Sequence, residues 1–120
     1  MKPVIQTLKN NCFAACLASL LEIGCDDVPN FVGEDTESKW LDKCSVWLKE
    51  KGLALIMIDE TLNSYWLRGD VPCIFSVDSP RGEGKRHAIV GMWREDKGVC
   101  LHDPWPDVSQ HIERIDIVYY

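Results

Sequence analysis

The hydrophobic pattern of this chain changes period once, close to Gly52, and this change limits the folds that the chain can adopt. Before Gly52, apolar residues recur every three to four positions, as they do on the buried face of an α-helix. After Gly52, short runs rich in isoleucine, valine and aromatic residues indicate β-strands. Helices followed by strands predict an α+β fold, in which an antiparallel sheet packs on the N-terminal helices.

The same pattern places the individual elements. The first helix is predicted over residues 12–23, capped by Asn10 or Asn11 and closed by Gly24. The second helix is predicted over residues 36–51, with Gly52 at its end. Strands are predicted at 53–58, 71–77, 87–93, 98–103 and 113–120, with a short helical turn within 59–69. The chain length suits one domain, over residues 1–120.

Charge and composition exclude several classes of function. The net charge of −6 gives a nucleic acid no basic surface to bind. No apolar run approaches the roughly 18 residues that span a bilayer, and no secretory signal is recognisable, so we expect a cytoplasmic protein without a membrane partner. Thiols stay reduced in that compartment, and most of the six cysteines are expected to be small core residues. The sequence leaves the oligomeric state open.

Cys12 is the cysteine whose surroundings suggest chemistry. It begins the first predicted helix, where the helix dipole lowers a thiol pKa and favours the reactive thiolate. The first helical amides also lack acceptors within the helix, so they can stabilise an oxyanion. Gln6, just before the helix, can supply a second N–H for this purpose. Taken alone, however, Cys12 also fits a buried helix cysteine.

A nucleophilic cysteine needs a base, and His87 with Asp103 can provide one. Both residues lie in the predicted hairpin of strands 87–93 and 98–103. If paired residue numbers add up to an even value such as 190, the two side chains share a face and can meet, while His102 points to the other face. An odd sum separates them, because a slip of one residue reverses every side chain.

The order of these residues resembles the papain-like cysteine peptidase superfamily. The likeness lies in a Gln six positions before a helix-initiating Cys, a His that opens a strand, and an Asp-Pro that closes the next strand. It is nearest to the bacteriocin-processing (double-glycine leader) peptidases and to small papain-like proteins of bacteria and phages. The resemblance implies Gln6 as oxyanion donor, Cys12 as nucleophile, His87 as general base and acid, and Asp103 as its orienting group. Those peptidases usually carry Asp-Cys-Gly-Pro where this chain has Asn-Cys-Phe-Ala.

Two other interpretations use the same residues. Cys12, Cys16 and His87 with another thiol could bind zinc, but no second closely spaced ligand pair supports this, and we predict neither a metal nor a cofactor. Cys16 is then a packing residue. A papain-like binding module, such as a phage or bacterial protein that masks a host factor, would need none of the four site residues.

We therefore expect a cysteine hydrolase that cleaves a peptide, isopeptide or related amide bond through a thioester. The same residues can transfer the acyl group to an amine, so an acyl transferase stays an alternative. The expected substrate is a peptide or a small protein. Predicted substrate contacts are Asn11 beside Cys12, Arg81 in the basic loop before His87, and Trp105 as the opposite wall of the cleft.

Overall fold

The computed structural model has the α+β architecture that the sequence predicts: two α-helices come first and an antiparallel sheet follows. It describes residues 1–8, 10–34, 38–59, 71–78, 86–94, 97–105 and 115–119. The helical turn predicted within 59–69 lies, apart from residue 59, outside the described residues.

Helix α1 (Cys12–Leu21) begins at the predicted residue but ends before the predicted Gly24. Glu22 is its C-cap, in the left-handed conformation with φ 58°, and the Ile23 N–H donates to the Ala18 carbonyl across the helix end. Glycine is the usual residue at such a position because other side chains are strained there. The prediction of Gly24 was therefore wrong, because the chain turns at a residue that local rules disfavour.

A short 3-10 helix, η1 (Cys25–Asp27), follows, and then helix α2 (Trp40–Lys49). Helix α2 is shorter than the predicted 36–51, and residues 36 and 37 lie outside the described part. Gly52 lies just beyond the helix with φ 74°, and the Leu53 N–H donates to the Leu48 carbonyl. Gly52 thus marks the end of the helical half, as the change of period predicts.

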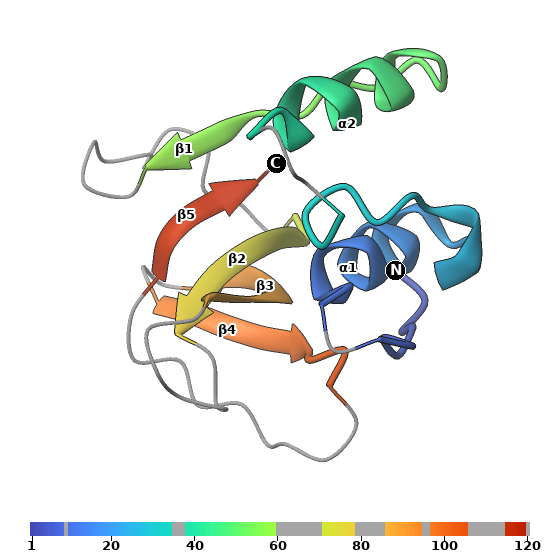
Figure 1. Cartoon of the computed structure of the whole chain (residues 1–120). Helices are drawn as coiled ribbons and strands as arrows, with labels where there is room; N and C mark the ends of the chain where they lie inside the picture. The colour runs from blue at the N-terminus through green and yellow to red at the C-terminus, as the bar shows by residue number, and fades with distance from the viewer. Residues whose placement is uncertain are drawn as a thin grey trace.

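Within the described residues, the sheet has five strands in the order β1-β5-β2-β3-β4, and neighbouring strands are antiparallel. The strands lie within one or two residues of their predicted bounds, except β1, which begins four residues late. Figure 1 shows a curved sheet with α1 lying against it and α2 near its β1 end. The strands are β1 (Met57–Asp59), β2 (Cys73–Asp78), β3 (Arg86–Arg94), β4 (Lys97–His102) and β5 (Ile115–Tyr119).

The β3–β4 hairpin contains an irregularity that positions the site. Near its turn, Gly91 pairs with Cys100, so paired numbers add up to 191, the odd value that would separate His87 from Asp103. Between Val90 and Gly91 the register shifts, and Val90 pairs with His102, which raises the sum to 192. The bulge thus gives the even parity that puts His87 and Asp103 on one face, although the sum is not the 190 that would place them directly opposite.

The buried core has two parts. In the first, α1 packs on β2 and β3, where Ile74, Ala88 and Val90 meet the apolar face of the helix; Cys44 and Leu48 join α2 to the same cluster. In the second, the alternate side chains of these strands pack together, with the rings of Phe75 and Trp93 5.2 Å apart in an edge-to-face contact. Helix α1 is therefore held rigidly against the strand that carries His87.

The Gly91 backbone lies so close to the Phe75 ring and the Val99 carbonyl that a larger residue does not fit there. A β-carbon built at this position would lie 2.2 Å from the Phe75 ring and 2.9 Å from the Val99 carbonyl oxygen. We expect Gly91→Ala to lower the free energy of unfolding by about 1–3 kcal/mol or more, as overpacking of a core does. Urea denaturation of the two proteins measures this difference. Gly52 is the control position: it is exposed, and a β-carbon built there would have no atom within 4 Å. Its φ is positive, and asparagine tolerates that backbone conformation, so Gly52→Asn should have a small effect on stability.

Candidate active site

Cys12 is the first residue of α1, with Asn11 at the N-cap position. Its thiol is free and half-buried. It lines a pocket together with His87 and Ala88 of β3, which brings the predicted nucleophile and the predicted base to one surface. The N-terminus of α1, with the positive end of the helix dipole, therefore lies at this pocket.

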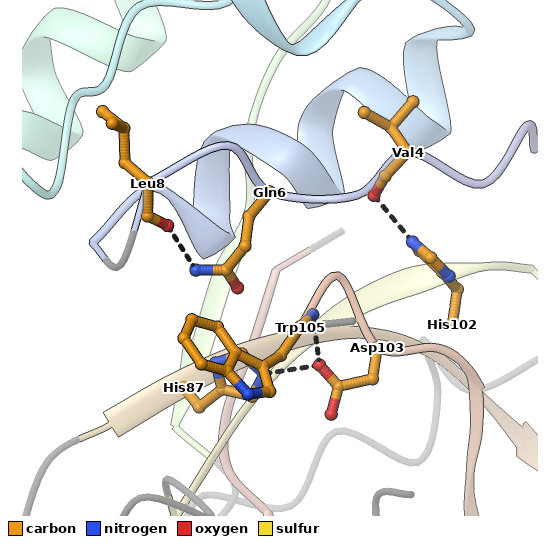
Figure 2. A network of polar contacts seen from close by, with 7 residues as sticks. All are labelled: Val4, Gln6, Leu8, His87, His102, Asp103 and Trp105. Carbon is orange, nitrogen blue, oxygen red and sulfur yellow. Dashed lines mark hydrogen bonds and ion pairs between the residues drawn. The ribbon is translucent and has the colours of Figure 1, made fainter. Parts of the chain in front are cut away.

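His87 and Asp103 are joined by a short hydrogen bond. His87 Nε2 lies 2.7 Å from Asp103 Oδ1, and both side chains are almost completely removed from solvent. The same carboxylate oxygen accepts the Trp105 backbone N–H at 2.9 Å, which fixes its position after the end of β4. Figure 2 shows both bonds converging on Asp103. Because Nε2 donates to the carboxylate, Nδ1 is the nitrogen left to exchange a proton.

The thiol and the imidazole change one another's pKa. Burial alone raises the pKa of the Cys12 thiol, but His87 and the backbone at Ala88 and Phe13 outweigh burial and lower it below that of an ordinary thiol. Burial alone lowers the pKa of His87, whereas its hydrogen bond with Asp103 and the nearby Cys12 thiol raise that pKa to about 9. A lowered thiol pKa beside a raised imidazole pKa favours a thiolate paired with an imidazolium.

The resting contact between these two groups is not a tight hydrogen bond. His87 Nδ1 is buried and has no partner of ordinary hydrogen-bond geometry among the described residues, although the thiol lies near enough to shift its pKa. Catalytic hydrogen bonds are often long in the free enzyme and tighten when substrate binds. The arrangement is therefore compatible with proton exchange between Cys12 and Nδ1.

Gln6 lies on the N-terminal segment that leads into α1, and only 6% of it is exposed. Its backbone N–H donates to the Pro104 carbonyl at 2.9 Å, beside Asp103. Its side-chain Nε2 donates to the Leu8 carbonyl at 2.6 Å, while Oε1 is buried without a partner among the described residues. Figure 2 shows the Gln6 amide on this segment, pointing toward the loop that follows β4. The bond to Leu8 fixes the amide orientation and leaves one N–H on Nε2.

The predicted substrate contacts have different surroundings. Asn11 is buried; its amide donates to Thr7 Oγ1 at 2.9 Å and to Cys25 Sγ at 3.5 Å, and its Oδ1 accepts the Leu8 N–H, so it shapes the loop before Cys12. Trp105 is half-buried directly after Pro104. Arg81 lies outside the described residues. A substrate role for these three residues stays a prediction.

Sequence reasoning missed one structural contact of the site. His102 Nε2 donates to the Val4 carbonyl at 2.7 Å and ties the N-terminal segment to the end of β4. Figure 2 shows this bond on the opposite side of the loop from Asp103. The predicted alternation places His102 on the face away from His87. Its partner, Val4, is remote in sequence, so no local pattern could have identified this hydrogen bond.

Cys16 and Cys44 lie in surroundings unlike those of Cys12. Burial raises the pKa of Cys16 well above the ordinary value, and nearby thiols and Asp103 add to this effect. Burial also raises the pKa of Cys44, to about 11. Within the described residues, no three His, Cys, Asp or Glu side chains gather as a metal-binding group. Only Cys12 among these three combines exposure to a pocket with a lowered pKa.

Searches with protein-family models, with curated protein sequences and with solved structures gave no match to this chain. The function has therefore to be argued from the site itself. Of the helices in the described part of the chain, none has both the length and the apolar character needed to cross a bilayer.

Proposed function

We propose that this chain is a papain-like cysteine hydrolase that cleaves a peptide, isopeptide or related amide bond in a peptide or small protein. One observation carries the proposal: the buried His87–Asp103 hydrogen bond of 2.7 Å leaves Nδ1 for the neighbouring Cys12, whose pKa is lowered. A nucleophile, a base and an orienting group in mutual reach are the common requirement of acyl-transfer sites. The predicted cytoplasmic location remains part of the proposal.

The first half of the reaction forms a thioester. The Cys12 thiolate attacks the carbonyl carbon, and the carbonyl electron pair moves to oxygen. A backbone amide at the start of α1 and the remaining N–H of Gln6 Nε2 stabilise this oxyanion. When the intermediate collapses, the carbon–nitrogen bond breaks, and the leaving amine takes the proton from Nδ1 of the His87 imidazolium.

The second half releases the acyl group. His87 Nδ1, now neutral, accepts a proton from water as the water oxygen attacks the thioester carbonyl. Collapse of the second intermediate expels the Cys12 thiolate and leaves a carboxylic acid, with the proton retained on His87. An amine in place of water gives a new amide by the same steps, so acyl transfer is the closest alternative outcome.

The test is capture of the thioester. We expect the native chain, incubated with peptides from a cell lysate and quenched in acid, to carry acyl groups on Cys12. Mass spectrometry of the peptide that contains Cys12 detects the added mass, and neutral hydroxylamine should remove it, because thioesters are cleaved by this amine. An amine added before quenching should convert acyl groups to amides if transfer competes with hydrolysis.

The matched control is Cys44→Ala, which removes a fully buried thiol from α2 and leaves Cys12 in place. It should show the same adduct as the native chain. A hydroxylamine-sensitive adduct that appears on another cysteine, or no adduct on Cys12 at any time after mixing, would contradict the proposed mechanism.

A further inference from the structure

A pocket of about 220 Å³ lies against the candidate catalytic residues. Cys12 and His87 form part of its wall, so a group inside it is close to the bond that the thiolate attacks. Ligand pockets for drug-sized molecules are commonly 300–1,000 Å³. The smaller volume here suits a single side chain rather than a large ligand.

The rest of the wall is mainly apolar and is built from remote parts of the chain. Phe13 and Trp40 pack edge to face with ring centroids 5.0 Å apart, which joins the start of α1 to the start of α2. Ala88 of β3 adds a buried methyl group beside His87. Val32, from the segment between η1 and α2, is 40% exposed and completes this surface. Packed rings and a methyl group form a wall with little freedom to adapt.

The charged residue of the wall, Arg86, is already paired with a carboxylate outside the pocket lining. Arg86 donates to the Ser76 carbonyl at 2.6 Å and to the Ser76 hydroxyl at 3.3 Å, and it also bonds the Asp78 carboxylate. The ion pair and these bonds hold the guanidinium along the edge of the sheet. An acidic group of a substrate would have to compete with Asp78, whereas an apolar group gains by leaving water.

We propose that this pocket receives one medium-sized apolar side chain of the substrate, from a residue next to the scissile bond. The inference rests on the proposed function, because it takes Cys12 as the nucleophile. It adds a selection rule: a branched aliphatic side chain of about leucine size is preferred over a hydrogen atom, a carboxylate or an ammonium group. Val32 and Trp40 set this preference.

Alkylation of Cys12 tests the pocket without a known substrate. The reagents are iodoacetamide and its N-isobutyl, N-carboxymethyl and N-aminoethyl derivatives, and mass spectrometry measures the rate at Cys12 of the native chain. Each rate is divided by the rate with glutathione, which removes differences in intrinsic reactivity. Each buried methylene is worth about fourfold, so we expect an advantage of about tenfold or more for the isobutyl reagent over iodoacetamide.

Two valine variants locate the effect. Val32→Asp places a carboxylate in the wall and should remove most of the isobutyl advantage. Val46→Asp makes the same change on α2 at a residue that is 60% exposed and outside the pocket wall, and it should keep the advantage. Circular dichroism establishes that both variants are folded. Trp40→Ala should shift the preference toward an N-naphthylmethyl reagent, because it enlarges the pocket.

The outcomes separate this inference from the proposed function. Fast alkylation of Cys12 by iodoacetamide with equal relative rates for all reagents would overturn the pocket assignment and leave the nucleophile standing. A preference for the carboxymethyl reagent would also overturn it, because it would make Arg86 the recognition group. If Cys12 reacts with iodoacetamide no faster than glutathione near neutral pH, the activated nucleophile fails, and the pocket assignment falls with it.

Discussion

Replacing Cys12 by alanine should lower peptide or amide cleavage by about 10⁴-fold or more, because no thioester can form without the thiolate. The fold should survive, since Cys12 is half-buried at the start of α1 and the change removes one sulfur atom. A peptide library incubated with each protein provides the measurement: mass spectrometry counts the new peptide termini that the native chain produces and the variant does not. Circular dichroism and thermal unfolding establish that the variant is folded.

Cys44→Ala distinguishes the loss of a nucleophile from the loss of a buried thiol. Cys44 is completely buried on α2, and its pKa of about 11 keeps it protonated near neutral pH. We expect this variant to lose about 1–2 kcal/mol of stability, as small deletions in a core do, and to keep its cleavage activity. If Cys12→Ala cleaves the library as well as the native chain does, Cys12 is not the nucleophile. If the native chain and Cys12→Ala both fail to cleave the library and both have the same effect in cells, the chain is a binding module.

Local patterns predicted the two helices and the five strands, because each element depends on near neighbours. The four candidate catalytic residues were chosen from the requirements of a cysteine nucleophile and from the family resemblance, and their catalytic role stays a prediction. The change of period at Gly52 separates helices from strands, and Gly52 has a positive φ just beyond the end of α2. The end of α1 was predicted less well, since Glu22 adopts a conformation that its side chain disfavours. Contacts with the rest of the fold outweigh such a local preference, and those contacts cannot be read from neighbouring residues.

The meeting of His87 with Asp103 shows where sequence reasoning reaches its limit. Alternation alone allows a register with an even sum of paired residue numbers or one with an odd sum. The β3–β4 hairpin has an odd sum from Gly91 onward, which would put His87 and Asp103 on opposite faces. The bulge between Val90 and Gly91 reverses the parity, and the tight contact of Gly91 with Phe75 lies beside it. Similarly, Val32 and Trp40 reach the pocket through long-range packing, so their place beside Cys12 could not be predicted from spacing.

Replacing Asp103 by alanine should lower cleavage by about 10²- to 10⁴-fold, because the variant leaves His87 Nε2 buried without its acceptor and the ring without its orientation. Asp103→Asn should be milder, since the amide oxygen can still accept the Nε2 proton. The ratio of these two losses measures how much of the effect is orientation. Asp42→Asn, at an exposed carboxylate of α2, is the matched control and should keep native activity.

The pH profile separates charge from orientation in the same variants. Cleavage needs the Cys12 thiolate, which is present above its lowered pKa, and the His87 imidazolium, which is lost as the pH rises through about 9. The native chain should therefore lose activity on the alkaline side near pH 9. Asp103→Asn removes the charge that raises the His87 pKa, so its alkaline limb should move to lower pH. An alkaline limb that stays in place would mean that Asp103 orients His87 without tuning its proton affinity, whereas native activity in Asp103→Ala would remove Asp103 from the site.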